Sequence, residues 1–502
     1  MRKFLSLILI LALASSLSLG CALAETPERE YAEIDWYFLD NNLNSEATGI
    51  VDDTLNEYFI EKLNTKVNFH RLSNYQDTMP TKISSGEDLG IVMFGTHLSY
   101  SVQAAREAFC PLEELLPAYA PNTYALFSED AWNGMKINGH IYGIPTWKDN
   151  CYIMSLIYNE ELCNEMGINP FDYDFKIWTD LIPMFYDMKE KRDEIHPEYA
   201  DYPIASERWG IFPYDFAIEC FHGELLCTNI PGIEAQGADG YTSDTVYCLF
   251  ETESFHDYAL KMQQLVEDGI YAYDYPADTW SSEKIPAFTG WGYVAIDDHL
   301  LADTFTSRLR IPDIWWIDTA NLTSAGNAIS SQCAHPERAM ELLELINTDT
   351  YVATTLRFGV EGLHHTRDAE GNITFEGTIN EKRDVYYYWY GGNYGSLSAV
   401  DVPPINGGHE FIDLLKQYND TAILADNLGF VFDTSSVQNE LSACNNVVAE
   451  YKSSLQNGKY ESQEETEEML NEFIDKLHAN GLDTLLTECQ TQLTAWRAAN
   501  GK

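Results

Sequence analysis

Residues Ala32–Leu39, with the sequence AEIDWYFL, form a short and largely apolar run that predicts a buried strand. After it, apolar residues recur at helical spacing over 51–63, and 67–72 is again strand-like. A short helical stretch over 75–86 precedes a further apolar strand over 89–94. This alternation is typical of βαβ units, so the sequence predicts an α/β fold with a parallel sheet and with ligands at the carboxyl ends of its strands.

Composition and charge narrow the function classes. The chain has 502 residues, of which 45% are hydrophobic, so it can bury a large core and is long enough for more than one lobe. It carries 30 Lys and Arg against 79 Asp and Glu, a formal net charge of −49. A field of this sign repels phosphate backbones and anionic membrane surfaces, so nucleic acid is not expected as a partner.

Residues 1–24 have the order of an export signal. Arg2 and Lys3 precede an apolar run, and Ala22-Leu23-Ala24 then offers a small-residue cleavage site. The stretch that ends at Cys21 also resembles a bacterial lipoprotein signal, in which Cys21 would carry the lipid, and the sequence does not choose between the two. In either case we expect an extracytoplasmic protein, tethered at the cell surface or secreted. No later apolar run approaches the ~20 residues that a membrane helix needs.

Cysteine usage and motif searches give no sign of a metal, redox or catalytic centre. The 10 cysteines are dispersed and include no C-x-x-C pair, although one or two bridges, such as Cys220 with Cys227, stay open. Phosphate-binding, zinc-protease, nucleophile-elbow and EF-hand motifs are absent from the sequence. His364 and His365 are adjacent, so their side chains point in different directions and do not complete a site. We expect no metal, no cofactor and no enzymatic activity.

Several segments, in order, resemble a known family. SSGEDLGIV (84–92), PLEELLPAYAPN (111–122) and above all MKINGHIYGIP (135–145) are similar to its characteristic stretches. NAIS followed by PERAM (327–340) and the Glu361-Gly362 pair extend the match. On these segments the chain resembles the extracellular solute-binding proteins of bacterial ABC importers (family 1 type), which include sugar and oligosaccharide binders.

The resemblance implies a two-lobed, periplasmic-binding-protein-like fold of type II, as in maltose-binding protein, with hinge crossovers near 143–147, before 321–327 and near 359–363. The stretch 429–444 resembles an extra helical domain found in one lipoprotein-type branch. The expected division of the chain is residues 1–24 for the signal peptide, 25–145 plus 320–361 for lobe 1, 146–319 plus 362–427 for lobe 2, and 428–502 for a helical C-terminal extension that packs on lobe 2.

The resemblance also implies the function. A ligand that touches both lobes stabilises the closed state, and the transmembrane subunits of an ABC permease then accept it. For a sugar ligand, aromatic faces cover the ring while polar side chains satisfy its hydroxyls. The net charge favours a neutral oligosaccharide, since an acidic one would need a local clamp from Arg71, Arg208 or Arg357. A peptide or other polar solute, and a secreted carbohydrate-active enzyme, remain the alternatives.

Candidate ligand-binding residues come from the ends of predicted strands, from the expected hinge and from aromatic positions of the second lobe. They are Trp36, Tyr37, Asn41, His97, Trp147, Lys148, Asp149, Tyr152, Trp209, Tyr214, Trp291, Asp297, Trp389 and Tyr390. Trp315-Trp316 is left out because alternation along a strand would bury at least one of the two rings. We expect a monomer that meets the membrane only through its permease and the lipid anchor considered above.

Overall fold

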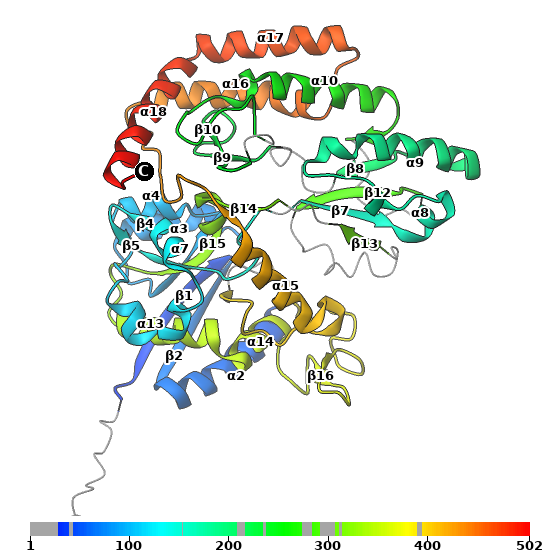
Figure 1. The fold of residues 1–502 in the computed structure, drawn as a ribbon. Helices are drawn as coiled ribbons and strands as arrows, with labels where there is room; N and C mark the ends of the chain where they lie inside the picture. Colours follow the sequence, from blue (N-terminus) through cyan, green and yellow to red (C-terminus); the bar gives the residue numbers. More distant parts are fainter. Residues whose placement is uncertain are drawn as a thin grey trace, which may run out of the picture.

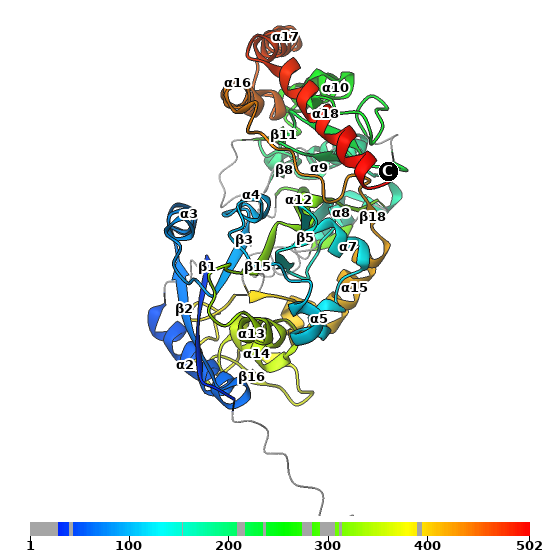
Figure 2. The same ribbon diagram turned by 90° about the vertical axis from the view of Figure 1, so that its left-hand side faces the viewer.

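The computed structural model describes residues 29–39, 44–152, 154–207, 216–233, 237–273, 284–291, 307–310, 314–388 and 394–502. It consists of two α/β lobes joined by a narrow hinge, with a helical C-terminal domain against the second lobe (Figures 1 and 2). The expected signal peptide over 1–24, with Cys21, lies outside the described residues. Within the ranges given, no helix has the length and apolar character to cross a membrane.

The first lobe is built on a five-stranded sheet in the order β2-β1-β3-β15-β6. Its strands are β1 (Ala32–Leu39), β2 (Thr65–Leu72), β3 (Ile91–Gly95), β6 (Gly143–Pro145) and β15 (Ala325–Ile329). The predicted strands β1, β2 and β3 are parallel, whereas β15 runs antiparallel to both β3 and β6. The sheet is mixed because the chain re-enters lobe 1 from the hinge beside the end of β3, so that β15 must run back along it.

Helices cover both faces of this sheet. They are α2 (Ser45–Leu63), α3 (Tyr75–Ser85), α4 (Tyr100–Ala105), α5 (Leu115–Tyr119), α6 (Pro121–Tyr124), α7 (Glu129–Gly134), α12 (Thr319–Leu322), α13 (Pro336–Thr348) and α14 (Thr350–Phe358), with a hairpin of β4 (Lys136–Ile137) and β5 (His140–Ile141) after α7. In α2 the buried residues Val51, Leu55 and Phe59 recur every four positions, which gives the helix one core-facing stripe. This spacing is the reason that the sequence predicted the helix.

The second lobe has its own five-stranded sheet, in the order β11-β8-β12-β7-β13. The strands are β7 (Met154–Asn159), β8 (Ala205–Glu207), β11 (Tyr271–Ala272), β12 (Ala287–Trp291) and β13 (Ser307–Arg310). Its helices are α8 (Glu160–Met166), α9 (Ile182–Ile195) and α10 (Glu253–Glu267), with 3-10 turns at Pro170–Asp172, Trp178–Leu181, Pro197–Tyr199 and Leu249–Glu251. A ribbon of β9 (Ile218–Cys220) and β10 (Cys227–Asn229) lies between this lobe and the hinge.

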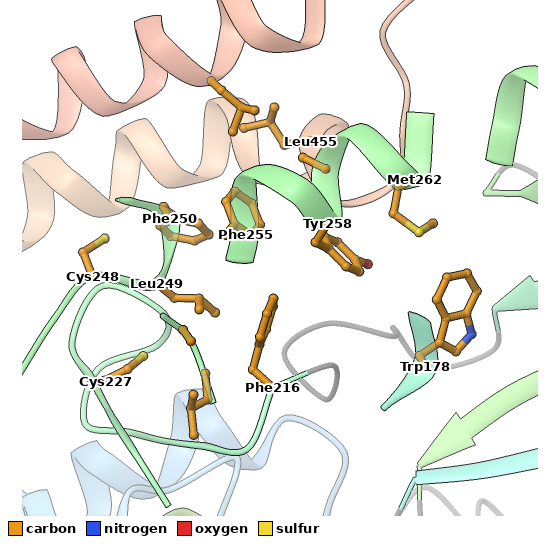
Figure 3. Close-up of a cluster of buried hydrophobic side chains, with 14 of the residues drawn as sticks. Trp178, Phe216, Cys227, Cys248, Leu249, Phe250, Phe255, Tyr258, Met262 and Leu455 are labelled. Atoms are coloured by element: carbon orange, nitrogen blue, oxygen red, sulfur yellow. The ribbon is translucent and has the colours of Figure 1, made fainter. Parts of the chain in front are cut away.

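Three long helices form the C-terminal domain: α16 (Gln438–Gln456), α17 (Gln463–Ala479) and α18 (Leu482–Ala499). They share one hydrophobic core with the second lobe. Figure 3 shows Leu455 of α16 beside Phe255 and Tyr258 of α10, within that core. Ser462 caps α17 by accepting a hydrogen bond from the backbone N–H of Glu465 at 3.1 Å.

The hinge consists of three chain segments side by side. β14 (Trp316–Ile317) and β18 (Ile423–Leu424) pair in parallel, and Tyr152 forms a bridge to Trp316. The backbone N–H of Tyr152 donates to the carbonyl of Trp316 at 2.7 Å, and that of Ala425 donates to Ile317 at 2.9 Å. The third crossing therefore lies at 423–425, not near 359–363 as the resemblance implied.

The segment that the sequence analysis assigned to the second lobe as 362–427 packs mainly against the first. It contains β16 (Thr366–Arg367), β17 (Ile373–Thr374), a 3-10 turn at Pro404–Asn406 and α15 (Gly408–Thr421). Phe375, Phe411 and Leu415 of this segment form one apolar cluster with Phe358 of α14 and with Trp147. The expected boundary is wrong here because the local pattern of the segment carries no information on which lobe covers it.

Candidate ligand-binding site

The edge of the first sheet that meets the hinge holds the candidate site. The parallel strands β1, β2 and β3 all end at this edge, and β6 also ends there, where Pro145 pairs with Gly326. The next residue, Thr146, donates its N–H to the carbonyl of Ala325 at 2.9 Å and starts the first crossover. Ligands of α/β proteins bind outside the carboxyl ends of such strands.

Tyr37 anchors an aromatic and charged cluster on one face of β1. Its ring stacks on that of His70 at 4.1 Å with an interplanar angle of 7°, and Lys82 of α3 lies 5.2 Å from its centroid. His70 in turn contacts Asp35, with Nε2 2.9 Å from Oδ1. Burial raises the pKa of Tyr37, while Lys82 opposes this shift. The phenol therefore stays neutral and can donate a hydrogen bond.

His97 lies just beyond β3, at the same edge. Its side chain is exposed, and its Nδ1 is 3.2 Å from Oε1 of Gln76 on α3. Since Lys82 is also on α3, this helix holds both His97 and the Tyr37 cluster in place. Tyr37 and His97, which both come from predicted strand ends, thus lie at one edge of the lobe.

Trp36 does not reach a surface that a ligand could touch. It is 0% exposed, its indole N–H donates to Oδ1 of Asn327 at 3.0 Å, and its ring packs against Phe38 and Phe69. The expectation that it binds ligand is wrong for this arrangement. Side chains alternate along a strand, so Trp36 and Tyr37 face opposite sides of the sheet, and the side of Trp36 is the core.

The hinge candidates Trp147, Lys148 and Asp149 are all buried. Trp147 packs in the apolar cluster with Phe411 described above, so it is a structural contact between the first crossover and the segment around α15. Nζ of Lys148 lies 3.4 Å from Oδ1 of Asp149. Burial raises the pKa of Asp149, and the adjacent ammonium group opposes that rise. Asn419 of α15 donates to the carbonyl of Lys148 at 2.6 Å, which fixes the crossover.

Tyr152 is the half-buried candidate of the hinge. Its ring centroid lies 5.3 Å from that of Trp316, with the planes 32° apart. Trp316 is buried and Trp315 only partly so, with Trp315 donating to the hydroxyl of Thr421 at 3.1 Å. The expectation that one ring of this pair is buried is confirmed.

The two described arginines that could clamp an acidic ligand are already engaged. Arg71 pairs with Asp52 at 2.5 Å and lies over the rings of Phe38 and Phe69. Arg357 is fully buried in α14 and donates to the carbonyls of Ala353, Tyr394 and Gly395. Burial lowers the pKa of Arg357 to about 10. Their hydrogen bonds hold the protein together, so neither is set up to bind an anion.

The remaining candidates fall in parts of the chain that the structure does not describe. Trp291 ends β12, but its side chain lies outside the described set. The others outside the described residues are Asn41, Trp209, Tyr214, Asp297, Trp389, Tyr390 and Arg208. Within the described ranges, no cluster of three or more His, Cys, Asp or Glu side chains is placed to hold a metal ion.

Sequence reasoning missed His70 and Asn419. His70 pairs with Tyr37 only through the register of β1 and β2, which places the two residues directly opposite each other. Asn419 lies 271 residues from Lys148 in sequence and contacts it only after the chain has crossed the hinge again. Strand alternation could have indicated His70, whereas no local signal points to Asn419.

Two comparisons by sequence find proteins that are similar to this chain. Residues 426–498 match a family described as a domain of unknown function, DUF3502. Over 469 residues the chain is 23% identical to a carbohydrate ABC transporter substrate-binding protein of Streptococcus pneumoniae serotype 4, covering 87% of this chain and 86% of the relative.

A comparison with solved structures finds proteins that share the fold of this chain. The N-glycan transport solute-binding protein of Streptococcus pneumoniae superposes with a TM-score of 0.74 at 20% identity, covering 93% of this chain and 98% of that one. Its complex with Man1GlcNAc gives a TM-score of 0.68 at 20% identity, with 92% and 98% covered. The chain thus has the two-lobed fold of the extracellular solute-binding proteins and is homologous over most of its length to a carbohydrate ABC transporter substrate-binding protein.

Proposed function

We propose that this protein captures a neutral oligosaccharide between its two lobes outside the cytoplasm and delivers it to an ABC permease. The observation that carries the proposal is the hinge, at which three chain segments join two separately cored lobes. Such a hinge suits closure around a ligand that touches both lobes. The similarity to a carbohydrate ABC transporter substrate-binding protein supports the same role.

The ligand class follows from charge and from the relatives. The solute-binding protein of Streptococcus pneumoniae has been solved with Man1GlcNAc and with Man5GlcNAc, which are uncharged glycans. In this chain the net charge of −49 opposes an acidic ligand, and Arg71 and Arg357 are engaged in hydrogen bonds of the fold. A neutral glycan needs only hydroxyl partners and aromatic faces.

We assign the contacts as follows. Tyr37 and His70, of which His70 is the more exposed ring, serve the first lobe together with His97, and Tyr152 serves the hinge. From the sequence analysis we keep Asn41, Trp209, Tyr214, Trp291, Asp297, Trp389 and Tyr390 as proposed contacts. Trp36 and Trp147 are withdrawn because their rings pack among apolar side chains, whereas Tyr37, which is also buried, lies against His70 and Lys82. The Lys148–Asp149 pair is assigned to the hinge itself.

The described arrangement corresponds to the open state in this proposal. One relative gives a TM-score of 0.74 for its structure without a named glycan, 0.68 with Man1GlcNAc and 0.65 with Man5GlcNAc. The TM-score is lower for both glycan complexes, which supports the assignment. We further propose a monomer, anchored through Cys21 or released by cleavage after Ala24; the mass of the mature N-terminus decides between the two.

The test is calorimetry of the mature protein with three ligand sets: Man5GlcNAc, uronate oligosaccharides and short peptides. We expect heat of binding with the neutral glycan and recovery of the glycan intact by mass spectrometry. At 100 times the Kd, ligand adds about 2.7 kcal/mol to the free energy of unfolding, so a thermal shift checks each hit. Binding of peptides alone, or cleavage of the glycan, would contradict the proposal.

A further inference from the structure

We propose that the C-terminal helical domain, to which its family description gives no function, is a hinge brace: it holds the third crossover against the second lobe through Arg497 and Asn427. The proposal rests on the proposed function, because a braced hinge matters only in a protein whose lobes move. It assigns a role to residues 426–498 as a part of the closing mechanism, and not as a site for a second ligand.

The third crossover touches both lobes in turn. Ala425 belongs to the small apolar cluster of the hinge, Leu428 to the core of lobe 1, and Phe430 to the core of lobe 2. Gly429 donates its N–H to the hydroxyl of Thr319 on α12 at 2.8 Å. Any rotation of one lobe against the other must therefore pass through the six positions from 425 to 430.

Asn427 fixes this segment to the second lobe. Its side chain is fully buried, and its Nδ2 donates to the hydroxyl of Thr228 on β10 at 3.1 Å and to the carbonyl of Ser243 at 2.7 Å. Beside it, the hydroxyl of Ser243 donates to Oδ2 of Asp426 at 2.5 Å. The two N–H donors of the amide are thereby used, which leaves its oxygen as the remaining group to satisfy.

That oxygen is satisfied by the C-terminal domain. Nη1 of Arg497, in the last turn of α18, donates to Oδ1 of Asn427 at 2.6 Å. Helix α18 is itself fastened to the second lobe, since Leu485 and Leu493 lie in the shared core. Lys502 adds a bond from its Nζ to the carbonyl of Asp426. The domain thus holds the crossover in place through hydrogen bonds on the side of lobe 2.

A groove separates the end of α18 from the first lobe. Its walls come from α18, with Trp496 and Asn500, and from the end of α7 and the β4–β5 turn, with Asn133 and Asn138, and they enclose a cavity of about 650 Å³. In Figure 2, α18, α7 and β18 lie on one side of the molecule, while α3 and α4, which follow the candidate edge, lie on the other. The groove leaves the lobes room to rotate while the hydrogen bond from Arg497 to Asn427 stays in place.

The brace affects ligand binding because it orders the third crossover before the ligand binds. A crossover that is already held needs no further ordering when the lobes close, so less of the interaction free energy of the ligand is lost to conformational entropy. Without Arg497, the oxygen of Asn427 loses its donor in a buried site, and the segment opens more often. Arg497 is therefore a positioning residue, which acts on the ligand through the hinge.

The test compares three variants: Arg497→Ala, Arg497→Lys and Gln492→Ala. Gln492 is the matched control because it also lies on α18 and bonds the backbone, accepting from the N–H of Asp433 at 2.9 Å and donating to its carbonyl at 2.9 Å, but outside the crossover. Hydrogen exchange of the unliganded protein is measured at 423–430, and binding of Man5GlcNAc by calorimetry.

For Arg497→Ala we expect roughly three- to ten-fold faster exchange at 423–430 and glycan binding weaker by a similar factor, the change typical of one lost hydrogen bond. Arg497→Lys should recover part of both effects, and Gln492→Ala should change neither. If Arg497→Ala does not fold, Arg497→Lys carries the comparison.

Unchanged exchange in Arg497→Ala, or an equal rise in Gln492→Ala, would overturn the brace. The exchange readout needs no ligand, so a failure of Man5GlcNAc to bind would count against the proposed function and not against this inference.

Discussion

At the scale of single residues, Glu219 stands out as an acid buried at the hinge. It lies on β9, and burial, together with the nearby carboxylate of Asp318, raises its pKa to about 8. Burial also raises the pKa of Asp318 to about 7. Asn427 and Lys502 oppose the shift of Glu219. Both acids are buried, Glu219 on β9 and Asp318 at the start of α12, so the hinge favours their protonated forms.

The two buried acids predict that the free energy of unfolding falls as the pH rises. The pKa of an unfolded glutamate is about 4.5, whereas burial raises that of folded Glu219 to about 8. The stabilisation is thus complete below about pH 4.5 and is lost as the pH rises through the folded value, and Asp318 acts in the same direction. We expect Glu219→Gln to flatten the decline in urea stability between about pH 5 and pH 9.

The control for that experiment is Glu467→Gln, a change of an exposed acid on α17 that should leave the pH dependence as in the parent. If Glu219→Gln shows the same slope as the parent protein, the buried acid is not the source of the dependence.

A second prediction at this scale concerns Tyr152. Its ring, 5.3 Å from that of Trp316, lies on the first crossover, where we propose that the sugar contacts both lobes. We expect Tyr152→Ala to weaken binding of Man5GlcNAc roughly three- to ten-fold, while Tyr152→Phe keeps most of the affinity because it keeps the ring. Calorimetry measures both. Tyr186→Ala, which alters an exposed ring on α9, should have no effect, and an equal loss there would contradict the assignment.

At the scale of elements, the ribbon of β9 and β10 places two thiols opposite each other. Cys220 pairs with Cys227 across the ribbon, and their sulfur atoms lie 3.3 Å apart. The neighbouring pair, Phe221 with Leu226, carries the hydrogen bond, so the cysteines occupy a non-hydrogen-bonded position, where side chains are closest. In the described structure both cysteines are free thiols.

We predict that this pair is oxidised to a disulfide in the exported protein. Each thiol gives up one hydrogen, and the electrons pass to a protein disulfide of the oxidising compartment. Alkylation of the unfolded, unreduced protein should leave Cys220 and Cys227 unlabelled, and reduction should expose both. Cys220→Ser should lower the free energy of unfolding by about 2 kcal/mol. Full labelling without reductant would show that the thiols stay free.

Elements also show how far the sequence could predict this fold. Strands β1 to β3 are predicted from their short apolar runs, and helix α2 is predicted because its buried residues recur at helical spacing. The sequence does not predict which lobe the segment around α15 packs against, because Phe411 and Leu415 form an apolar stripe that would suit either lobe. Trp36 shows the same limit, because its burial depends on Asn327, a neighbour 291 residues away in sequence.

At the scale of the whole molecule, the net charge of −49 predicts how binding responds to salt. A neutral glycan feels no net force from this field, so its affinity should be nearly the same at about 50 mM and about 500 mM salt. An acidic oligosaccharide should bind weakly at low salt and better at high salt, as screening removes the repulsion. Calorimetry at the two salt concentrations tests this. A strong loss of glycan affinity at high salt would contradict the assignment of a neutral ligand.

The shared core of the second lobe and the C-terminal domain has a consequence for biosynthesis. Phe250 of the lobe packs on Phe473 of α17 at 5.0 Å, and residues as far along the chain as Leu493 complete that core. In the export that we propose, in which the N-terminus crosses the membrane first, the second lobe therefore lacks its last packing partners until almost the whole polypeptide has emerged. Premature collapse of that lobe is disfavoured, and the protein gains its final shape only after translocation is nearly complete.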